Sequence, residues 1–389
     1  MHDMDEKRLL DLIESKHEES VTFLEQLVNT DSGSYTLDGV DKVAKMISSR
    51  LEAIGFRTER LFSGKYADHL KAYKEGKGTV RILTLCHMDT VFAEGTAAER
   101  PFKVIDNKAY GPGVYDMKAG SVMLVEALEA LYEQGFDDYG SITCLFNSDE
   151  ERGSETSEKY ILEEGAKADV CLVCETGVPG NKVVIERQGG GIYNLDIYGK
   201  ASHAGAEPEK GIHALEELAH KLLAMHAVTD YSKSKSISVG VVRGGERSNI
   251  IPDHVWAEID VRCRTNEDGE ELIRKMEEIT ARSWVKGTNS VLTKVMFRSP
   301  IEKTAGNVKL FELLNKAGSK IGMEMVEEYC GGASDGNYTS AIGTPTIDSL
   351  GPEGDYEHTA DEVMYIDTLT PRTKLFALFL IEIAKGWTK

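Results

Sequence analysis

The sequence has no long apolar run, little cysteine and a deficit of basic residues. The longest aliphatic and aromatic run near the C-terminus, Leu375–Ile381, is far shorter than the about 20 residues that a membrane-spanning helix needs. The first residues contain no basic segment followed by an apolar one, so we expect no secretory signal. Six cysteines in 389 residues form no disulfide framework, which favours a reducing compartment. We therefore expect a cytoplasmic protein without a membrane partner.

The charge balance excludes another class of partner. Asp and Glu number 65 against 45 Lys and Arg, which gives a formal net charge of -20. Proteins that bind nucleic acids need a basic surface to meet the phosphates, so we expect no nucleic-acid partner. The 41% hydrophobic share is enough for folded cores. At about 100–200 residues per domain, the length suggests two or three domains.

The one Cys-x-x-C pair, Cys171 and Cys174, lies within a predicted buried strand. Side chains three positions apart on a strand point to opposite faces of the sheet. We therefore interpret both cysteines as core residues rather than as metal ligands.

Two kinds of pattern divide the chain. Up to about residue 186, and again from about 298, helices alternate with short apolar strands such as Val80–Cys86 and Ser141–Phe146. This alternation indicates an α/β domain with a central, mostly parallel sheet, made of residues 1–186 and 298–389. Residues 187–297 instead have the order strand, helix, strand, strand, helix, strand, with Asn266 as the expected cap of the second helix. That order predicts an inserted, ferredoxin-like α+β domain.

Polar side chains gather where the predicted strands end. His87 and Asp89 end an apolar strand and share one face, because their spacing is two. A metal-bound histidine usually donates its other ring N–H to an acceptor such as a carboxylate, although a simple hydrogen-bonded histidine would also fit. Asp116 follows the tight loop Gly111-Pro-Gly113 and directly precedes a helix. Asp116 could therefore cap that helix rather than bind a metal.

Further carboxylates follow the next strands. Asp149-Glu150-Glu151 comes directly after one strand, Glu175 ends another, and His358 lies near the end of the chain. Crowded carboxylates at the carboxyl edge of an α/β sheet, where such sheets bind ligands, repel one another unless a cation is present. Histidine with carboxylate oxygens suits zinc, and also manganese or cobalt. Together these clusters predict a metal site.

With these clusters in place, the sequence resembles the dinuclear zinc peptidase family that includes glutamate carboxypeptidase, aminoacylase and succinyl-diaminopimelate desuccinylase, and above all its glutamate carboxypeptidase branch. The matching stretches occur in the family's order over most of the chain: His87-Met-Asp-Thr-Val91, Gly111-Pro-Gly-Val-Tyr-Asp-Met-Lys118, Asp149-Glu-Glu-Arg-Gly-Ser154, Cys174-Glu-Thr176, Gly199-Lys-Ala-Ser-His-Ala-Gly-Ala-Glu-Pro208, Asn249-Ile-Ile-Pro252, Gly331-Gly-Ala-Ser-Asp335 and His358-Thr359. The resemblance implies a zinc-exopeptidase-like catalytic domain at 1–186 and 298–389. It also implies that the inserted domain at 187–297 is a lid and dimerisation domain.

The resemblance implies two Zn²⁺ per chain and a role for each matching residue. Asp116 would bridge the two ions, with His87 and Glu175 completing one site and Glu151 and His358 the other.

Three further expectations concern the chemistry at this site. Glu150 would be the general base that takes a proton from the water bridging the metals and so forms the attacking hydroxide. Asp89 would orient His87. The peptide bond after Asp116 would be cis.

The remaining matches concern the substrate. His203 would stabilise the oxyanion in the partner subunit's active site, within a homodimer formed through the lid domain. Asn249 and Arg262 would hold the substrate's carboxylate, and Gly331 and Gly332 would offer N–H groups beside it.

The expected enzyme is therefore a carboxypeptidase that acts on a small peptide or N-acyl amino acid and releases glutamate or a similar residue. An N-acyl-amino-acid deacylase or a dipeptidase remains an alternative, because the metal residues do not separate these activities. The stretch Gly331-Gly-Ala-Ser also departs from the glutamate carboxypeptidase pattern, which tends to have glycine and threonine there. A metal-free binding protein on the same fold is the rival from another class.

Overall fold

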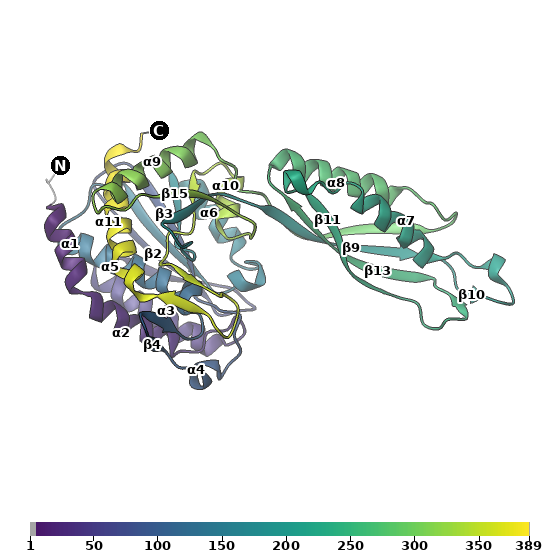
Figure 1. Cartoon of the computed structure of the whole chain (residues 1–389), viewed down its shortest axis with the longest axis horizontal. Helices are drawn as coiled ribbons and strands as arrows, with labels where there is room; N and C mark the ends of the chain where they lie inside the picture. Colours follow the sequence, from purple (N-terminus) through teal and green to yellow (C-terminus); the bar gives the residue numbers. More distant parts are fainter. Residues whose placement is uncertain (1–4, 389) are drawn as a thin grey trace. The chain divides into compact units, whose positions relative to one another are not determined.

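The computed structural model describes residues 5–388, and the chain divides into two compact units (Figure 1). One unit contains the chain up to Ile185, Lys303–Tyr329 and the chain from Ser334 onward. The other contains Glu186–Glu302 together with Cys330–Ala333. The short segment Cys330–Ala333, which carries Gly331 and Gly332, thus groups with the second unit, whereas the sequence placed it in the first domain.

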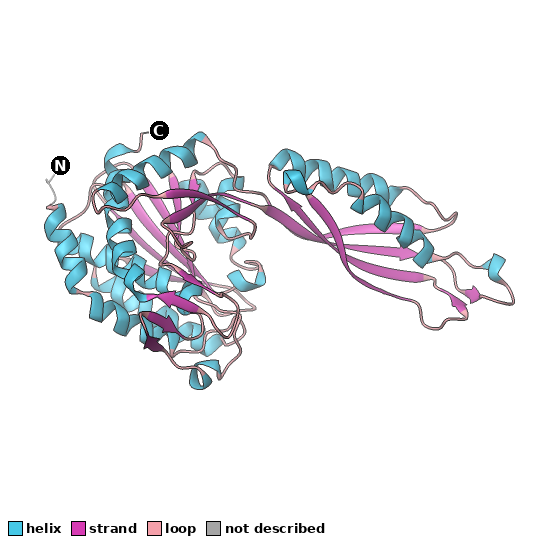
Figure 2. Cartoon of the chain, in the orientation of Figure 1, coloured by secondary structure: helices cyan, strands magenta, loops and turns pink. Residues whose placement is uncertain are grey.

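A six-stranded sheet with the strand order β1-β2-β6-β3-β7-β16 forms the centre of the first unit (Figure 2). Its strands are β1 (Arg57–Leu61), β2 (His69–Glu75), β3 (Arg81–His87), β6 (Ser141–Asn147), β7 (Val170–Val173) and β16 (Thr346–Ile347). The strands from β6 to β16 pair in parallel, whereas β1 and β2 add an antiparallel edge. The predicted α/β fold with a mostly parallel central sheet is therefore confirmed.

Helices cover both faces of this sheet. The helices of this unit are α1 (Glu6–Ser15), α2 (His17–Val28), α3 (Leu37–Ala53), α4 (Thr96–Glu99), α5 (Ala119–Glu133), α6 (Glu158–Lys167), α9 (Ala305–Ser319), α10 (Gly336–Ala341) and α11 (Leu369–Gly386). The main core packs one sheet face against helices that include α5 and α11, and a smaller core packs the opposite face against α6 and α10. Because side chains alternate along a strand, Cys174 enters the main core and Cys171 the smaller one. The prediction that these two cysteines face opposite sides is confirmed.

Short strands complete the first unit. A small sheet with the order β17-β18-β5-β4 is made of β4 (Lys103–Ile105), β5 (Lys108–Tyr110), β17 (Gly354–Asp355) and β18 (Val363–Tyr365). Two further strands, β8 (Lys182–Arg187) and β15 (Val326–Cys330), pair with each other, and the last residues of each belong to the second unit.

The second unit is a four-stranded antiparallel sheet with two helices on one face. The sheet order is β11-β13-β9-β14, and the elements are β9 (Gly189–Tyr198), β11 (Ser236–Gly244), β13 (His254–Cys263), β14 (Asn289–Arg298), α7 (Ala214–His226) and α8 (Asn266–Ala281). Along the chain they follow the predicted ferredoxin-like order. The expected cap of α8 was wrong: the side chain of Thr265 accepts the N–H of Asp268, whereas Asn266 is the first helical residue and bonds Glu302.

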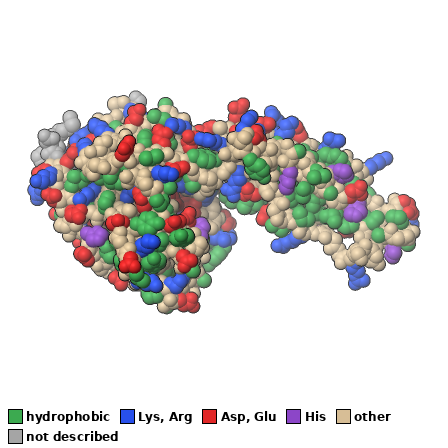
Figure 3. Space-filling model, in the orientation of Figure 1, with side chains coloured by type: hydrophobic (Ala, Val, Ile, Leu, Met, Phe, Trp, Pro, Cys, Tyr) green, Lys and Arg blue, Asp and Glu red, His purple; other side chains and the backbone are tan. Residues whose placement is uncertain are grey.

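The surface carries charges of both signs. Figure 3 shows acidic and basic side chains intermixed over the face in view. Between residues 5 and 388, no helix is both long and apolar enough to cross a bilayer.

Candidate metal centre

The predicted ligands come together at the carboxyl edge of the central sheet. His87 is the last residue of β3, and Glu175 follows the end of the neighbouring parallel strand β7. Asp116 lies in the turn Val114–Lys118 that precedes α5, and the peptide bond between Asp116 and Met117 is cis, as the resemblance predicts. The backbone of Asp116 is not helical (φ -109°, ψ 97°), and its side chain faces the two histidines rather than capping the helix.

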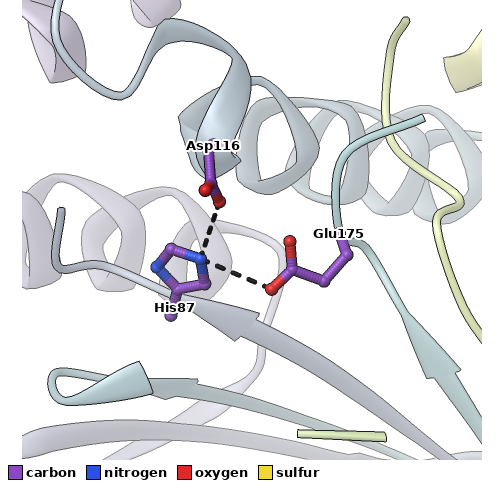
Figure 4. Close-up of side chains that lie close together, drawn as sticks. All are labelled: His87, Asp116 and Glu175. Carbon is purple, nitrogen blue, oxygen red and sulfur yellow. Dashed lines mark hydrogen bonds and ion pairs between the residues drawn. The ribbon is translucent and has the colours of Figure 1, made fainter. Parts of the chain in front are cut away.

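The first cluster consists of His87, Asp116 and Glu175 (Figure 4). The Nε2 atom of His87 lies 3.1 Å from Oδ1 of Asp116 and 3.4 Å from Oε1 of Glu175. All three residues are buried, with His87 only 2% exposed. The Nδ1 atom of His87 lies 2.9 Å from the main-chain carbonyl of Asp89. Because a carbonyl can only accept, Nδ1 carries a proton, and Nε2 is the atom left for a metal.

The second cluster uses the other oxygen of Asp116. The Nε2 atom of His358 lies 3.0 Å from Oδ2 of Asp116 and 3.2 Å from Oε2 of Glu151. Glu151 stands on the short helical turn Glu150–Arg152 directly after β6, and His358 lies in the loop between β17 and β18. Asp116 is therefore the one residue that the two clusters share.

The donor set fits a pair of divalent cations. Zinc lies about 2.0–2.2 Å from nitrogen and oxygen ligands in tetrahedral geometry, which places two ligand atoms about 3.4 Å apart. The separations of 3.0–3.4 Å in both clusters are close to this value. The Oε1 atom of Glu151 is buried and has no hydrogen-bond partner within the described part of the chain. A buried carboxylate oxygen without a partner is costly unless a cation satisfies it.

The pKa values at this site show how strongly the charges interact. Burial lowers the pKa of His87, but the charge of Glu175 and the hydrogen bond with Asp116 outweigh burial and raise it well above the usual value. Hydrogen bonds with Asp116 and Glu151 raise the pKa of His358 to about 11. Burial raises the pKa of Glu151 to about 8, despite its hydrogen bond with His358. Protons on the two histidines thus balance the crowded carboxylates, and a divalent cation would compete with these protons.

Asp89 links both clusters to the loop after β6. Its carboxylate is 1% exposed and accepts the hydroxyl of Ser34 at 2.7 Å and the main-chain N–H groups of Glu150 and Glu151 at 3.2 and 3.3 Å. The carboxylate is 3.6 Å from Nδ1 of His87, farther than the Asp89 carbonyl. Asp89 therefore contacts His87 mainly through its main chain and the Glu150 loop through its side chain.

The structure also has a cavity next to this site and a third group of acidic residues elsewhere in the first unit. A cavity of about 410 Å³ lies beside Glu151 and is lined by Gly33–Thr36, Thr90–Glu94 and Arg152. A third acidic group, formed by Glu19, Glu126 and Glu129, surrounds the guanidinium of Arg50, which pairs with all three carboxylates.

The other predicted site residues lie in the second unit. His203 stands on the short strand β10 (Ser202–His203), which pairs with β12 (Ile250–Ile251), and its Nδ1 accepts the N–H groups of Gly205 and Ala206 at 3.1 Å each. The main-chain carbonyl of Asn249 accepts the N–H of Ala204.

Arg262 and the glycine pair have partners within the same unit. The guanidinium of Arg262, on β13, donates to both carboxylate oxygens of Asp260 at 2.8–3.1 Å. The carbonyl of Gly332, which follows Gly331, accepts a hydrogen bond from Arg187 at 3.1 Å.

One residue next to the site was not predicted. The carboxylate of Glu362, which is 1% exposed, accepts the main-chain N–H groups of Gly113, Tyr115 and Asp116. In the sequence, Glu362 is one more acid after His358 and Asp361, and nothing in that stretch distinguishes it from a solvated charge.

Two histidines and several carboxylates around one shared aspartate, at the carboxyl edge of an α/β sheet, define the class of metal-dependent hydrolases. Comparison with known proteins gives the family: residues 83–382 match peptidase family M20/M25/M40, and the chain belongs to it. The chain is 34% identical over 366 residues to carboxypeptidase G2 of Pseudomonas sp. (strain RS-16). This match covers 92% of this chain and 87% of that protein.

A more distant sequence relative and a solved structure also match this chain over two thirds of its length or more. The chain is 28% identical over 285 residues to succinyl-diaminopimelate desuccinylase of Rickettsia akari (strain Hartford), covering 67% of this chain and 73% of that protein. The crystal structure of aminopeptidase PepT from Bacillus cereus ATCC 10987 superimposes with a TM-score of 0.76 at 21% identity, over 98% of this chain and 99% of that one. The resemblance to the family and to its glutamate carboxypeptidase branch is therefore confirmed, and the protein is an enzyme of the metallopeptidase and amidohydrolase type.

Proposed function

We propose that the protein is a two-zinc carboxypeptidase that cleaves an amide bond and releases a C-terminal amino acid, glutamate or a similar residue. The observation that carries this proposal is the carboxylate of Asp116, whose two oxygens face two separate histidine–carboxylate clusters. The similarity to carboxypeptidase G2 over most of both chains supports the carboxypeptidase reaction.

The proposed ligand assignment follows the two clusters. His87 and Glu175 would hold one cation, Glu151 and His358 the other, and Asp116 both. Two divalent cations bring four positive charges against the three negative charges of Asp116, Glu151 and Glu175, so one positive charge remains to attract an anionic oxygen. When bound, the cations would polarise the scissile carbonyl and make water a stronger nucleophile. Mn²⁺ or Co²⁺ could replace Zn²⁺, because both accept the same nitrogen and oxygen ligands.

Glu150 is the proposed general base. It belongs to neither ligand cluster but stands next to Glu151, on a turn that Asp89 fixes through two main-chain N–H groups. Its carboxylate would take a proton from the attacking water and pass that proton to the nitrogen of the departing amino acid. Glu151 could not share this task while its carboxylate binds a cation.

We propose that His203 stabilises the negative oxygen that forms on the scissile carbonyl, in the active site of the partner subunit of a homodimer. The tautomer of His203 supports this role: Nδ1 accepts two main-chain N–H groups, so the proton of the neutral ring lies on Nε2, which is then a hydrogen-bond donor. Such a donor aimed at the developing charge would lower the barrier.

The released amino acid's carboxylate is the proposed ligand of Asn249 and Arg262, beside the N–H groups of Gly331 and Gly332. Arg262 has five N–H donors in total, and Asp260 holds the guanidinium in place through its Nε and Nη2 atoms. The remaining donors would bind the substrate's carboxylate.

A deacylase acting on N-acyl amino acids is the second candidate, because the relatives of this chain include succinyl-diaminopimelate desuccinylase. The same metal ligands and the same base would serve it. A substrate panel separates the candidates: glutamate-terminated peptides and N-acyl glutamates, other N-acyl amino acids, and free dipeptides, each assayed with the zinc-loaded enzyme. The highest kcat/KM on the glutamate-terminated substrates would support the carboxypeptidase, whereas a preference for other N-acyl amino acids would overturn glutamate specificity and leave the deacylase.

A further inference from the structure

Glu362 is a buried acid that belongs to neither ligand cluster. It directly precedes β18 and is 1% exposed. Its Oε1 accepts the N–H groups of Tyr115 at 2.9 Å and Asp116 at 3.0 Å, and its Oε2 accepts the N–H of Gly113 at 3.0 Å. All three donors lie in the loop that carries the shared ligand, and one of them belongs to that ligand.

A second buried ionisable residue, Lys118, bonds the same loop. Lys118 is 2% exposed, and its Nζ donates to the carbonyl of Pro112 at 3.3 Å and to that of Thr30 at 3.1 Å. Glu362 thus binds N–H groups of the loop, and Lys118 binds one of its carbonyls. The backbone on both sides of Gly113 is tied to side chains that cannot move into solvent.

The shared ligand needs such support because its position is demanding. Asp116 must direct one oxygen toward His87 and the other toward His358. Glu362 holds the main chain of Asp116 and leaves its side chain to the two clusters.

We propose that Glu362 is a positioning residue: it holds the loop Gly113–Asp116 so that the Asp116 carboxylate is presented to both cations before they bind. This inference rests on the proposed function only in assuming that cations bind at the two clusters. It identifies a residue outside the ligand set on which metal affinity depends.

The chemistry of Glu362 suggests the variant to test. The two oxygens of Glu362 accept three loop N–H groups between them, and an amide would offer one acceptor oxygen instead of two. Glu362→Gln keeps the size of the side chain but turns an N–H₂ group toward at least one loop N–H. Asp31→Asn is the matched control, because Asp31 also accepts two main-chain N–H groups in this unit, those of Gly95 and Ala97 at 2.8 Å each.

The experiment measures zinc affinity directly, by competition with a chromophoric chelator. We expect Glu362→Gln to bind zinc about 10–100-fold more weakly than the wild type, as is typical when a group that orients a metal ligand is lost. Asp31→Asn should bind zinc as the wild type does. Wild-type zinc affinity in Glu362→Gln would overturn the inference, and so would an equal loss in Asp31→Asn.

A second measurement uses only the wild type, so its result does not depend on whether a variant folds. In the zinc-free wild type, hydrogen exchange of the amides of Gly113, Tyr115 and Asp116 should already be slow, because Glu362 holds them without metal. Fast exchange that slows only after zinc is added would overturn the inference, since the metal would then organise the loop.

These readouts are independent of substrate. A wild type that binds zinc and shows both effects, but hydrolyses no amide, would refute the proposed function and leave the role of Glu362 intact. Normal hydrolysis by the wild type together with unchanged zinc affinity in Glu362→Gln would refute the role of Glu362 and leave the proposed function intact.

Discussion

The main-chain N–H of Glu150 donates to the carboxylate of Asp89 over 3.2 Å. This bond fixes the proposed base relative to the strand end that carries His87. The two residues follow the neighbouring parallel strands β3 and β6, which end at the same edge of the sheet. The main chain of the proposed base is therefore positioned by a residue that follows a strand of the central sheet.

If Glu150 is the base, Glu150→Gln should lower kcat by at least about 10²-fold, the lower range for loss of general acid–base catalysis. Zinc affinity should stay at the wild-type level, because Glu150 belongs to neither cluster. Glu155→Gln is the control: this exposed acid lies five residues further along and pairs with Lys65. Near-normal kcat in Glu150→Gln would show that another group takes the proton.

The shared role of Asp116 predicts a difference between two ligand variants. Asp116→Ala should lose both metals on dialysis, because both clusters lose a ligand. His358→Ala should lose only one, since the cluster of His87, Asp116 and Glu175 remains complete. Metal counting by mass spectrometry checks this, and an Asp116→Ala protein that keeps two metals would show that the aspartate is not shared.

Zinc binding should release protons near neutral pH. The pKa of His87 is raised well above its usual value and that of His358 to about 11, so both rings are protonated in the metal-free protein at neutral pH. Metal ligands must be deprotonated, so zinc affinity should rise as pH increases and fall as the solution becomes more acidic. Calorimetry in buffers of different ionisation enthalpy measures the release. His358→Ala should release fewer protons, and a zinc affinity independent of pH would contradict the account.

Asp89→Ala should destabilise the metal-free protein. It leaves the buried hydroxyl of Ser34 and the N–H groups of Glu150 and Glu151 without their acceptor. One unsatisfied buried group costs about 1–3 kcal/mol, so the free energy of unfolding should fall by at least that amount. Urea denaturation measures it, with Ser34→Ala as a control that removes one hydrogen bond and should cost less. A stability equal to that of the wild type would argue against the network around Asp89.

Much of the site could be predicted because it depends on local patterns. Apolar strands that stop at His87 and before Glu175 place both residues at one edge, since parallel strands end on the same side. The period of two along a strand likewise separated Cys171 from Cys174. These inferences need only the alternation of side chains and the direction of the strands.

The rest depends on contacts between distant segments or on small local differences. Glu362 and Asp116 are 246 positions apart, and no pattern near either residue indicates that a carboxylate meets main-chain N–H groups. The adjacent residues Thr265 and Asn266 can both cap a helix, and only the backbone decides between them. The sequence also led us to expect the Asp89 carboxylate beside His87, where the structure places the Asp89 carbonyl closer.

The central claim, a hydrolase that depends on two metals, is tested most directly by metal content measured together with activity. The protein is purified without chelator, its metals are counted, and hydrolysis of an N-acyl glutamate is assayed before chelation, after it, and after zinc is returned. The account predicts about two metals per chain and hydrolysis that chelation abolishes and zinc restores. A chain that binds no metal even when zinc is added, or hydrolysis that chelation leaves unchanged, would contradict it.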